Sequence, residues 1–351
     1  MNKGKVSDSI LRRSVLKYVQ QNNSMVNNES SLISEAKVGA DCALFTVPSE
    51  IIATATAIAV GQGAQAVVEA MLNAGNNLIC GGAEMFGVTI SIVLPEDTDE
   101  SELKKIMESA LHFAKIHQIT IFGGNTVINK EVSQAIITVT ALGHSMGYKL
   151  KSCKPGMDIV MSKWIGLQGT ARIASQKRAD LEKRLPHRLL NEAVKFGCAG
   201  MKETAKADLL ESMGEKYMSV IPEARIAMEQ NVCLMHDVSG GGIFRALWEL
   251  ADLTGTGILV ELKKIPVRQE TIEICEVFGL NPYELLSGGA LLMVTEKGEA
   301  LAEALYAEGI PAEVIGKLTD NNDKALINRS YESEEIRYLE RPKTDEIDRI
   351  L

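Results

Sequence analysis

The stretch His236-Asp237-Val238-Ser239-Gly240-Gly241-Gly242 connects an apolar run at residues 232–235 to a run with helical periodicity at residues 243–253. An apolar run, a glycine turn and an amphipathic run in this order are typical of a buried strand that leads into a helix. Further elements of this half are expected at residues 290–295, 298–307 and 313–318. Strands that alternate with helices predict an α/β fold with mixed sheets.

The first half of the chain shows the same alternation. Strands are expected at residues 51–60, 87–94, 119–122 and 134–142, and helices at residues 64–73 and 103–114. Gly75 is expected to end the first helix, and Gly123-Gly124 to form a turn. The turn Lys154-Pro155-Gly156 then introduces a strand at residues 157–162 and a long, mainly helical segment. We therefore expect an N-terminal domain at residues 1–152, a C-terminal α/β domain at residues 153–330 and a charged tail at residues 331–351.

The composition narrows the choice of partner and compartment. The 351 residues include 37 Lys and Arg against 46 Asp and Glu, which gives a net charge of −9. Such a surface repels a phosphate backbone. The longest apolar stretch, residues 51–60, is about half a membrane span, the first residues lack the pattern of an export signal, and the six cysteines form no CxxC pair. We expect a cytoplasmic protein with reduced thiols that binds neither nucleic acid nor membrane.

Glycine-rich turns and acidic or amide side chains occur together along the chain. Adjacent glycines lie at residues 81–82, 123–124, 240–242 and 288–289. The turn at 240–242 best suits a phosphate, because free N–H groups and the positive end of a helix dipole converge there. Taken alone, one such turn more often serves tight chain reversal than ligand binding. Several turns near Asp41, Glu69, Asn125 and Asp237 indicate a nucleotide bound with Mg²⁺.

Some side chains have two interpretations at this point. His236 titrates near neutral pH and is therefore a candidate general base, or else it orients the glycine turn beside it. Lys163 and Arg172 flank the turn at residues 165–169 and could meet a phosphate, although basic residues on helices more often face water.

Seven short motifs follow one another in an order that resembles a known superfamily. They read GADCA (39–43), GGNT (123–126), KPGMDIV (154–160), IGLQG (165–169), HDVSGGG (236–242), SGGALL (287–292) and EVIG (313–316). This order resembles the aminoimidazole ribonucleotide synthetase, or PurM-like, superfamily over about residues 35–320. The two ends of the chain are most similar to the branch that contains the hydrogenase maturation factor HypE.

The resemblance implies an architecture and a ligand. The N-terminal domains of a homodimer would pair their sheets into a β-barrel, with a C-terminal α/β domain on each flank. ATP would lie in a cleft near the dimer interface, and its Mg²⁺ would be held by Asp41 and Glu69. The other nucleotide-binding residues would be Gly39, Gly123, Gly124, Asn125, Thr126, Gly240, Gly241 and Gly242. The expected catalytic residues are Asp41, His236 and Asp237.

Several positions depart from the pattern of this superfamily. Thr56, Val68 and Asn125 stand where acids or an amide are usual. HypE ends in Pro-Arg-Ile-Cys, whereas this chain ends Asp348-Arg349-Ile350-Leu351, so the carrier thiol of HypE is expected to be missing.

Two functions follow from this pattern. The first is an ATP-dependent enzyme that phosphorylates, activates or dehydrates a small carbonyl- or hydroxyl-bearing substrate, with a maturation protein as a candidate partner. The alternative is a catalytically silent, dimeric binding or scaffold protein whose Mg²⁺-ATP site has degenerated.

Overall fold

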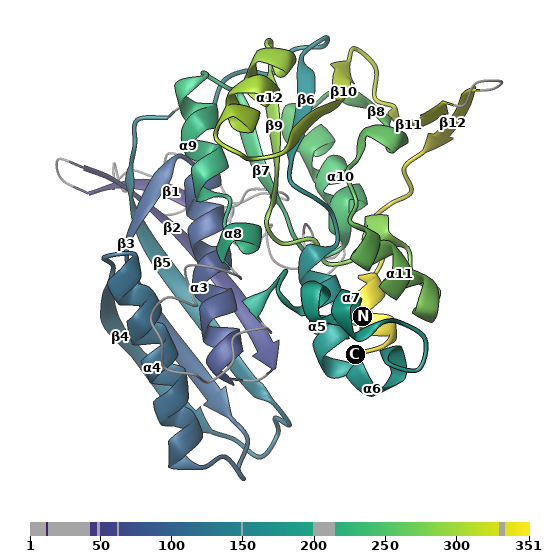
Figure 1. The fold of residues 1–351 in the computed structure, drawn as a ribbon. Helices are drawn as coiled ribbons and strands as arrows, with labels where there is room; N and C mark the ends of the chain where they lie inside the picture. Colours follow the sequence, from purple (N-terminus) through teal and green to yellow (C-terminus); the bar gives the residue numbers. More distant parts are fainter. Residues whose placement is uncertain are drawn as a thin grey trace.

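The computed structural model describes residue 12 and residues 43–47, 50–61, 63–148, 150–198, 215–329 and 334–351. These residues form two sheets. The chain passes from the first sheet to the second between β5 (Ala135–Ser145) and β6 (Asp158–Ser162). Figure 1 shows the first sheet with its helices at the lower left and the second sheet at the upper right. The predicted α/β class with mixed sheets is confirmed.

The first sheet has the strand order β1-β2-β5-β3-β4 and contains one parallel pair, β3 with β4. Its other strands are β1 (Ala43–Val47), β2 (Glu50–Gly61), β3 (Ala83–Leu94) and β4 (Thr120–Ile128). Along β2 the alanines are buried and alternate with exposed residues such as Ile58 and Val60. Helices α3 (Gly63–Cys80) and α4 (Glu100–Ile116) cover the buried face (Figure 1). The small alanine side chains let α3 approach the sheet closely, and the opposite face stays exposed.

Helix α3 is longer than predicted. Gly75 does not end it, and the helix continues for five residues beyond this glycine to Cys80. Gly75 is buried, and a Cβ atom there would lie 3.4 Å from the methyl group of Met85. Leu78 and Ile79 are buried as well. Their packing outweighs the cost of about 1 kcal/mol that glycine carries inside a helix.

The predicted turn at Gly123-Gly124 is wrong, because both glycines lie inside β4. Gly123 pairs with Thr89 and Gly124 with Ile90, just after a register shift in β3. A Cβ atom on Gly124 would lie 1.7 Å from the carbonyl oxygen of Ile90. Glycine is needed here because two strand backbones approach closely, and no chain reversal is involved.

The second sheet has the strand order β12-β11-β8-β10-β6-β9-β7. Its other strands are β7 (Leu234–Val238), β8 (Gly257–Glu261), β9 (Ala290–Thr295), β10 (Ala312–Thr319), β11 (Lys324–Arg329) and β12 (Glu334–Tyr338). The helices of this half are α5 (Leu167–Gln176), α6 (Arg178–Leu181), α7 (His187–Val194), α8 (Glu215–Met218), α9 (Ile221–Glu229), α10 (Gly242–Thr254), α11 (Gln269–Phe278) and α12 (Gly298–Ala307). The predictions at residues 290–295 and 298–307 are confirmed by β9 and α12.

Asn76 connects α3 to the second half of the chain. Its side chain is buried, its Nδ2 donates to the carbonyl oxygen of Met218 at 2.8 Å, and its Oδ1 accepts from the N–H of Val220 at 3.0 Å. Two further residues of α3, Ile79 and Cys80, belong to a hydrophobic cluster with β6, β7 and β9. One helix therefore packs on both sheets.

The charged tail at residues 331–351 has more structure than its composition indicates. Residues 334–338 form the edge strand β12, and a 3₁₀ turn, η6 (Glu346–Arg349), follows. Ile347, Ile350 and Leu351 pack against a hydrophobic cluster that includes Leu285. No helix in the described part of the chain is long and apolar enough to cross a membrane.

Candidate functional site

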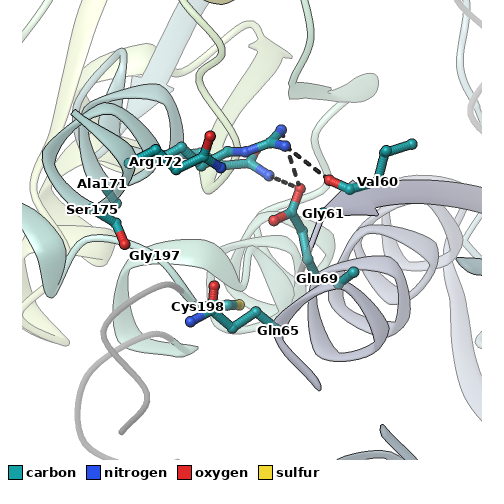
Figure 2. A pocket seen from close by; sticks show the side chains of 12 residues that line it. Val60, Gly61, Gln65, Glu69, Ala171, Arg172, Ser175, Gly197 and Cys198 are labelled. Atoms are coloured by element: carbon teal, nitrogen blue, oxygen red, sulfur yellow. Dashed lines mark hydrogen bonds and ion pairs between the residues drawn. The ribbon is translucent and has the colours of Figure 1, made fainter. Parts of the chain in front are cut away.

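A small cavity lies where α3 meets α5 (Figure 2). Its walls come from the end of β2, the first half of α3, and α5 with the nearby Gly197 and Cys198. The volume of the cavity is about 30 Å³. This is space for about two water molecules, so a nucleotide does not fit unless the side chains around the cavity move.

Glu69 of α3 is the acidic side chain of this cavity. Gln168 Nε2 donates a hydrogen bond of 2.7 Å to Glu69 Oε1, and Arg172 Nη1 lies 4.0 Å from the same oxygen. Burial raises the pKa of the Glu69 carboxyl group, and the nearby Arg172 and Gln168 partly oppose this rise. The cavity therefore holds a carboxylate that is poorly solvated and compensated mainly by one guanidinium.

Arg172 connects three elements at the cavity. It extends from α5 toward Glu69 on α3, and its Nη2 donates to the carbonyl oxygen of Val60 near the end of β2 at 3.0 Å (Figure 2). The sequence indicated both Glu69 and Arg172, but it gave no sign that they meet. It missed Gln168 as a partner of Glu69, although this residue lies inside the motif at residues 165–169.

The described residues of the cavity do not fit a bound Mg²⁺. They supply one carboxylate, Glu69, which already accepts a hydrogen bond from Gln168 and lies beside the cationic Arg172. Across the described ranges, the structure brings together no group of three His, Cys, Asp or Glu side chains that could hold a metal. Gly39 and Asp41 lie outside the described residues, so their predicted roles stay predictions.

His236 and Asp237 are buried in β7, and neither lines the Glu69 cavity. His236 Nε2 lies 3.2 Å from Glu249 Oε2 on α10, and Arg245 Nη1 lies 3.8 Å from the other oxygen of that carboxylate. This network ties β7 to α10. It favours the interpretation of His236 as a residue that orients the glycine turn.

The glycine turn before α10 already holds an anionic group of the same chain. The Asp345 carboxylate accepts hydrogen bonds from the backbone N–H groups of Gly241 at 2.6 Å, Leu286 at 3.1 Å and Ile347 at 2.9 Å. Burial is the main cause of the raised pKa of Asp345, and these three hydrogen bonds act in the opposite direction. Arg245 Nη2 also donates to the carbonyl oxygen of Lys343. The tail thus occupies the position where the sequence predicted a phosphate.

Asn125 and Thr126 lie on the exposed edge strand β4, which β3 and β5 separate from β2. Three strand spacings amount to about 14 Å. Neither residue lines the described walls of the Glu69 cavity. Their predicted contact with a phosphate is therefore not formed around Glu69 within one chain.

Two family models together match most of the chain. The N-terminal domain of AIR synthase related proteins matches residues 39–145, and their C-terminal domain matches residues 154–328. The chain belongs to the AIR synthase related protein family.

Relatives of this AIR synthase related protein include hydrogenase maturation proteins. It is 26% identical to a hydrogenase expression/formation protein of Methanocaldococcus jannaschii over 72% of this chain and 70% of the relative. It is also 26% identical to the carbamoyl dehydratase HypE of Rhodobacter capsulatus over 69% of this chain and 66% of the relative. The alignments thus span about two-thirds of the length of these relatives.

Solved structures of HypE have a similar fold. HypE in a HypE-HypF complex superposes with a TM-score of 0.69 and 20% identity, over 94% of this chain and all of that chain. HypE in complex with ATP superposes with a TM-score of 0.66 and 17% identity, over 99% of this chain and 97% of that chain. The PurM-like fold expected from the motifs is confirmed.

The departures from the family pattern can now be placed in this AIR synthase related protein. Thr56 lies within β2, five residues before the strand ends, and its hydroxyl oxygen lies 3.0 Å from that of Thr140 on β5. Val68 is 1% exposed and belongs to the core, whereas Glu69 faces the cavity. Of the two neighbours in α3, only Glu69 is in a position to meet a ligand there.

Proposed function

We propose that this protein is a HypE-like ATP-binding protein and that the phosphates of ATP bind where α3 meets α5. The observation that carries the proposal is the position of Arg172, which reaches from α5 to both Glu69 and Val60. A guanidinium is a preferred partner of phosphate oxygens. The similar fold of HypE in complex with ATP supports the choice of ligand.

In this proposal Arg172 binds phosphate oxygens while it stays beside Glu69, because the five N–H donors of a guanidinium can serve both groups. The cavity would have to widen to admit the nucleotide. Asp41 and Gly39 remain proposed ligand-binding residues of this site, and Asn125 and Thr126 would contribute to it from a second copy of the chain. Asp237 remains a proposed catalytic residue, although it does not line the cavity.

The proposed reaction is the ATP-dependent activation, dehydration or phosphorylation of a small carbonyl- or hydroxyl-bearing substrate. Phosphoryl transfer depends mainly on positioning and on charge neutralisation, and Arg172 supplies a positive charge at the site. The likeness to HypE in a HypE-HypF complex supports a hydrogenase maturation protein as the partner.

A binding or scaffold protein without turnover is the second candidate. Two observations favour it. The Glu69 carboxylate already lies beside the cationic Arg172 and accepts a hydrogen bond from Gln168, and the turn at Gly241 is filled by the carboxylate of Asp345. A protein that no longer hydrolyses ATP would tolerate both arrangements.

Nucleotide binding is tested by thermal unfolding with and without ATP and Mg²⁺. A ligand at 100 times its dissociation constant stabilises the native state by about 2.7 kcal/mol, which raises the melting temperature by several degrees. We expect this rise in the parent protein and its loss in Arg172→Gln. The matched control is Arg178→Gln on the neighbouring α6, which pairs with Glu182 at the surface and should keep the rise.

The outcome separates the two candidates. The absence of a shift with ATP, ADP or GTP in the parent contradicts the proposed function. A shift without release of phosphate or ADP over hours favours the binding protein.

We also propose that the open face of the first sheet pairs with a second copy of the chain. Ile58 and Val60 are 63% and 45% exposed on this face. Replacing Ile58 with lysine should halve the mass measured by light scattering, because a charge cannot be buried in an apolar interface without a partner. The control Tyr306→Lys changes an apolar residue of α12 that is 75% exposed and should leave the mass unchanged. A monomeric parent protein would contradict this proposal.

A further inference from the structure

A second and much larger cavity lies on another side of α3. Its volume is about 730 Å³, which is within the range of small-molecule sites. One wall is formed by the end of α3, the start of β3 and the end of α4. The other wall is formed by residues next to β6, α8, α9 and the connection before β10. We call this cavity the α3–α9 cleft.

The cleft contains a buried ion pair with one unsatisfied oxygen. Lys163 Nζ lies 2.6 Å from Glu223 Oε1 and donates to the carbonyl oxygen of Ser219 at 2.5 Å. The Glu223 side chain is 1% exposed, and its Oε2 accepts no hydrogen bond from the described residues. A buried carboxylate oxygen without a donor costs free energy. A ligand in the cleft that presents an N–H or O–H group would remove this cost.

The backbone at Lys163 is held in an unfavourable conformation. Its φ angle is +55°, in the left-handed region that residues other than glycine rarely adopt, and its N–H donates to the carbonyl oxygen of Pro311 at 2.7 Å. This conformation directs Lys163 to Glu223 while the next residue, Trp164, also lines the cleft. Strained residues of this kind are concentrated at ligand-binding sites.

Charged side chains of both signs and aromatic side chains line the rest of the cleft, and among them Arg268 lies against two rings. The guanidinium of Arg268 lies 5.0 Å from the centre of the Trp164 ring and 5.2 Å from that of Phe196. Arg268 also pairs with the carboxylate of Glu270, at 3.3 Å from Nε and 3.4 Å from Nη2. The Arg268 side chain is 31% exposed, so the rest of its guanidinium remains accessible to a ligand. Such a guanidinium, stacked on a ring, is oriented to bind a carboxylate. The facing wall contributes apolar side chains, among them Ile79 and Ile116.

We propose that the α3–α9 cleft binds a small aromatic carboxylic acid that also carries an amide N–H, the class of the N-acyl amino acids. The carboxylate would pair with Arg268, the amide N–H would donate to Glu223 Oε2, and the ring would pack against Trp164 and the apolar wall. This site is separate from the Glu69 cavity, and the proposal does not depend on ATP binding.

The test uses the tryptophan of the cleft as the reporter. The chain has two tryptophans. Trp164 lines the cleft, whereas Trp248 lies on α10 with its ring against Lys324 of β11 and does not line the cleft. In the variant Trp248→Phe the emission therefore comes from Trp164 alone. Hippurate is the probe, because it combines a benzoyl ring, an amide N–H and a carboxylate. We expect a saturable change in emission with a dissociation constant of about 1 mM.

A matched ligand isolates the role of Glu223. In 3-benzoylpropionate a CH₂ group replaces the N–H of hippurate, and it should bind about tenfold more weakly because it cannot donate to Oε2. In the Trp248→Phe protein, Arg268→Met should weaken the binding of hippurate by about tenfold. The surface control Arg329→Met should leave the binding of hippurate unchanged. No saturable change up to about 20 mM hippurate, equal affinity for the two ligands, or unchanged binding in Arg268→Met would each overturn the proposal.

Discussion

Glu223→Leu is expected to lower the free energy of unfolding by about 3–5 kcal/mol. The side chain of Lys163 is 6% exposed, and Glu223 Oε1 is its anionic partner at 2.6 Å. Without Glu223, an ammonium group would remain buried with only the carbonyl oxygen of Ser219 to compensate it. Chemical denaturation monitored by circular dichroism measures the change.

The matched variants separate the ion pair from general damage. Lys163→Met combined with Glu223→Leu should recover most of the loss, because both charges are then removed together. Glu192→Leu breaks the exposed pair with Lys195 and should change the free energy of unfolding by less than about 0.5 kcal/mol. A double variant as unstable as Glu223→Leu alone would show that shape, and not charge, dominates at this position.

Gly242→Ala is expected to destabilise the fold by more than about 2 kcal/mol. Gly242 has a φ angle of +66°, and a Cβ atom there would lie 2.4 Å from the carbonyl oxygen of Tyr283. That oxygen belongs to the backbone of the 3₁₀ turn η5 (Pro282–Glu284), which contacts α10, so it cannot rotate away as a flexible side chain would. Both the backbone angle and the contact therefore oppose alanine.

The same turn offers a matched control in Gly240→Ala. A Cβ atom on Gly240 would meet nothing within 4 Å, and its φ angle is not in the left-handed region. This change should leave the melting temperature almost unchanged in a thermal scan. Equal effects of the two substitutions would refute the view that Gly242 is required by packing against residues 283–284.

The elements with the clearest sequence patterns were predicted well. The strand Ala290–Thr295 and the helix Gly298–Ala307 were found where the periodicity placed them, because their apolar faces match the sheet on which they pack. The end of α3 was missed, since the helix is continued past Gly75 by packing against the second half of the chain. The turn at Gly123-Gly124 was missed because close approach of strands and chain reversal favour the same residue type.

The candidate site was predictable only in its separate parts. Glu69 and Arg172 were both noticed, but residues about a hundred positions apart give no local signal that they meet. The contact of Asp345 with Gly241 was missed for the same reason, because an acid in a charged tail has the pattern of a solvated residue. The sequence predicted an anionic group, a phosphate, at the glycine turn. The structure has an anionic group there, but it is the carboxylate of Asp345 from the same chain.

The two hydrogen bonds of Asn76 bear on how the molecule moves. Both the donor and the acceptor of the Asn76 amide bind the backbone of the second half, so α3 is fixed to both sheets. A hinge that swings one half away from the other would have to break both bonds and open the cluster around Ile79. We therefore expect ligands to enter through local rearrangement of side chains on the microsecond scale or faster, and the two halves to tumble as one body in solution.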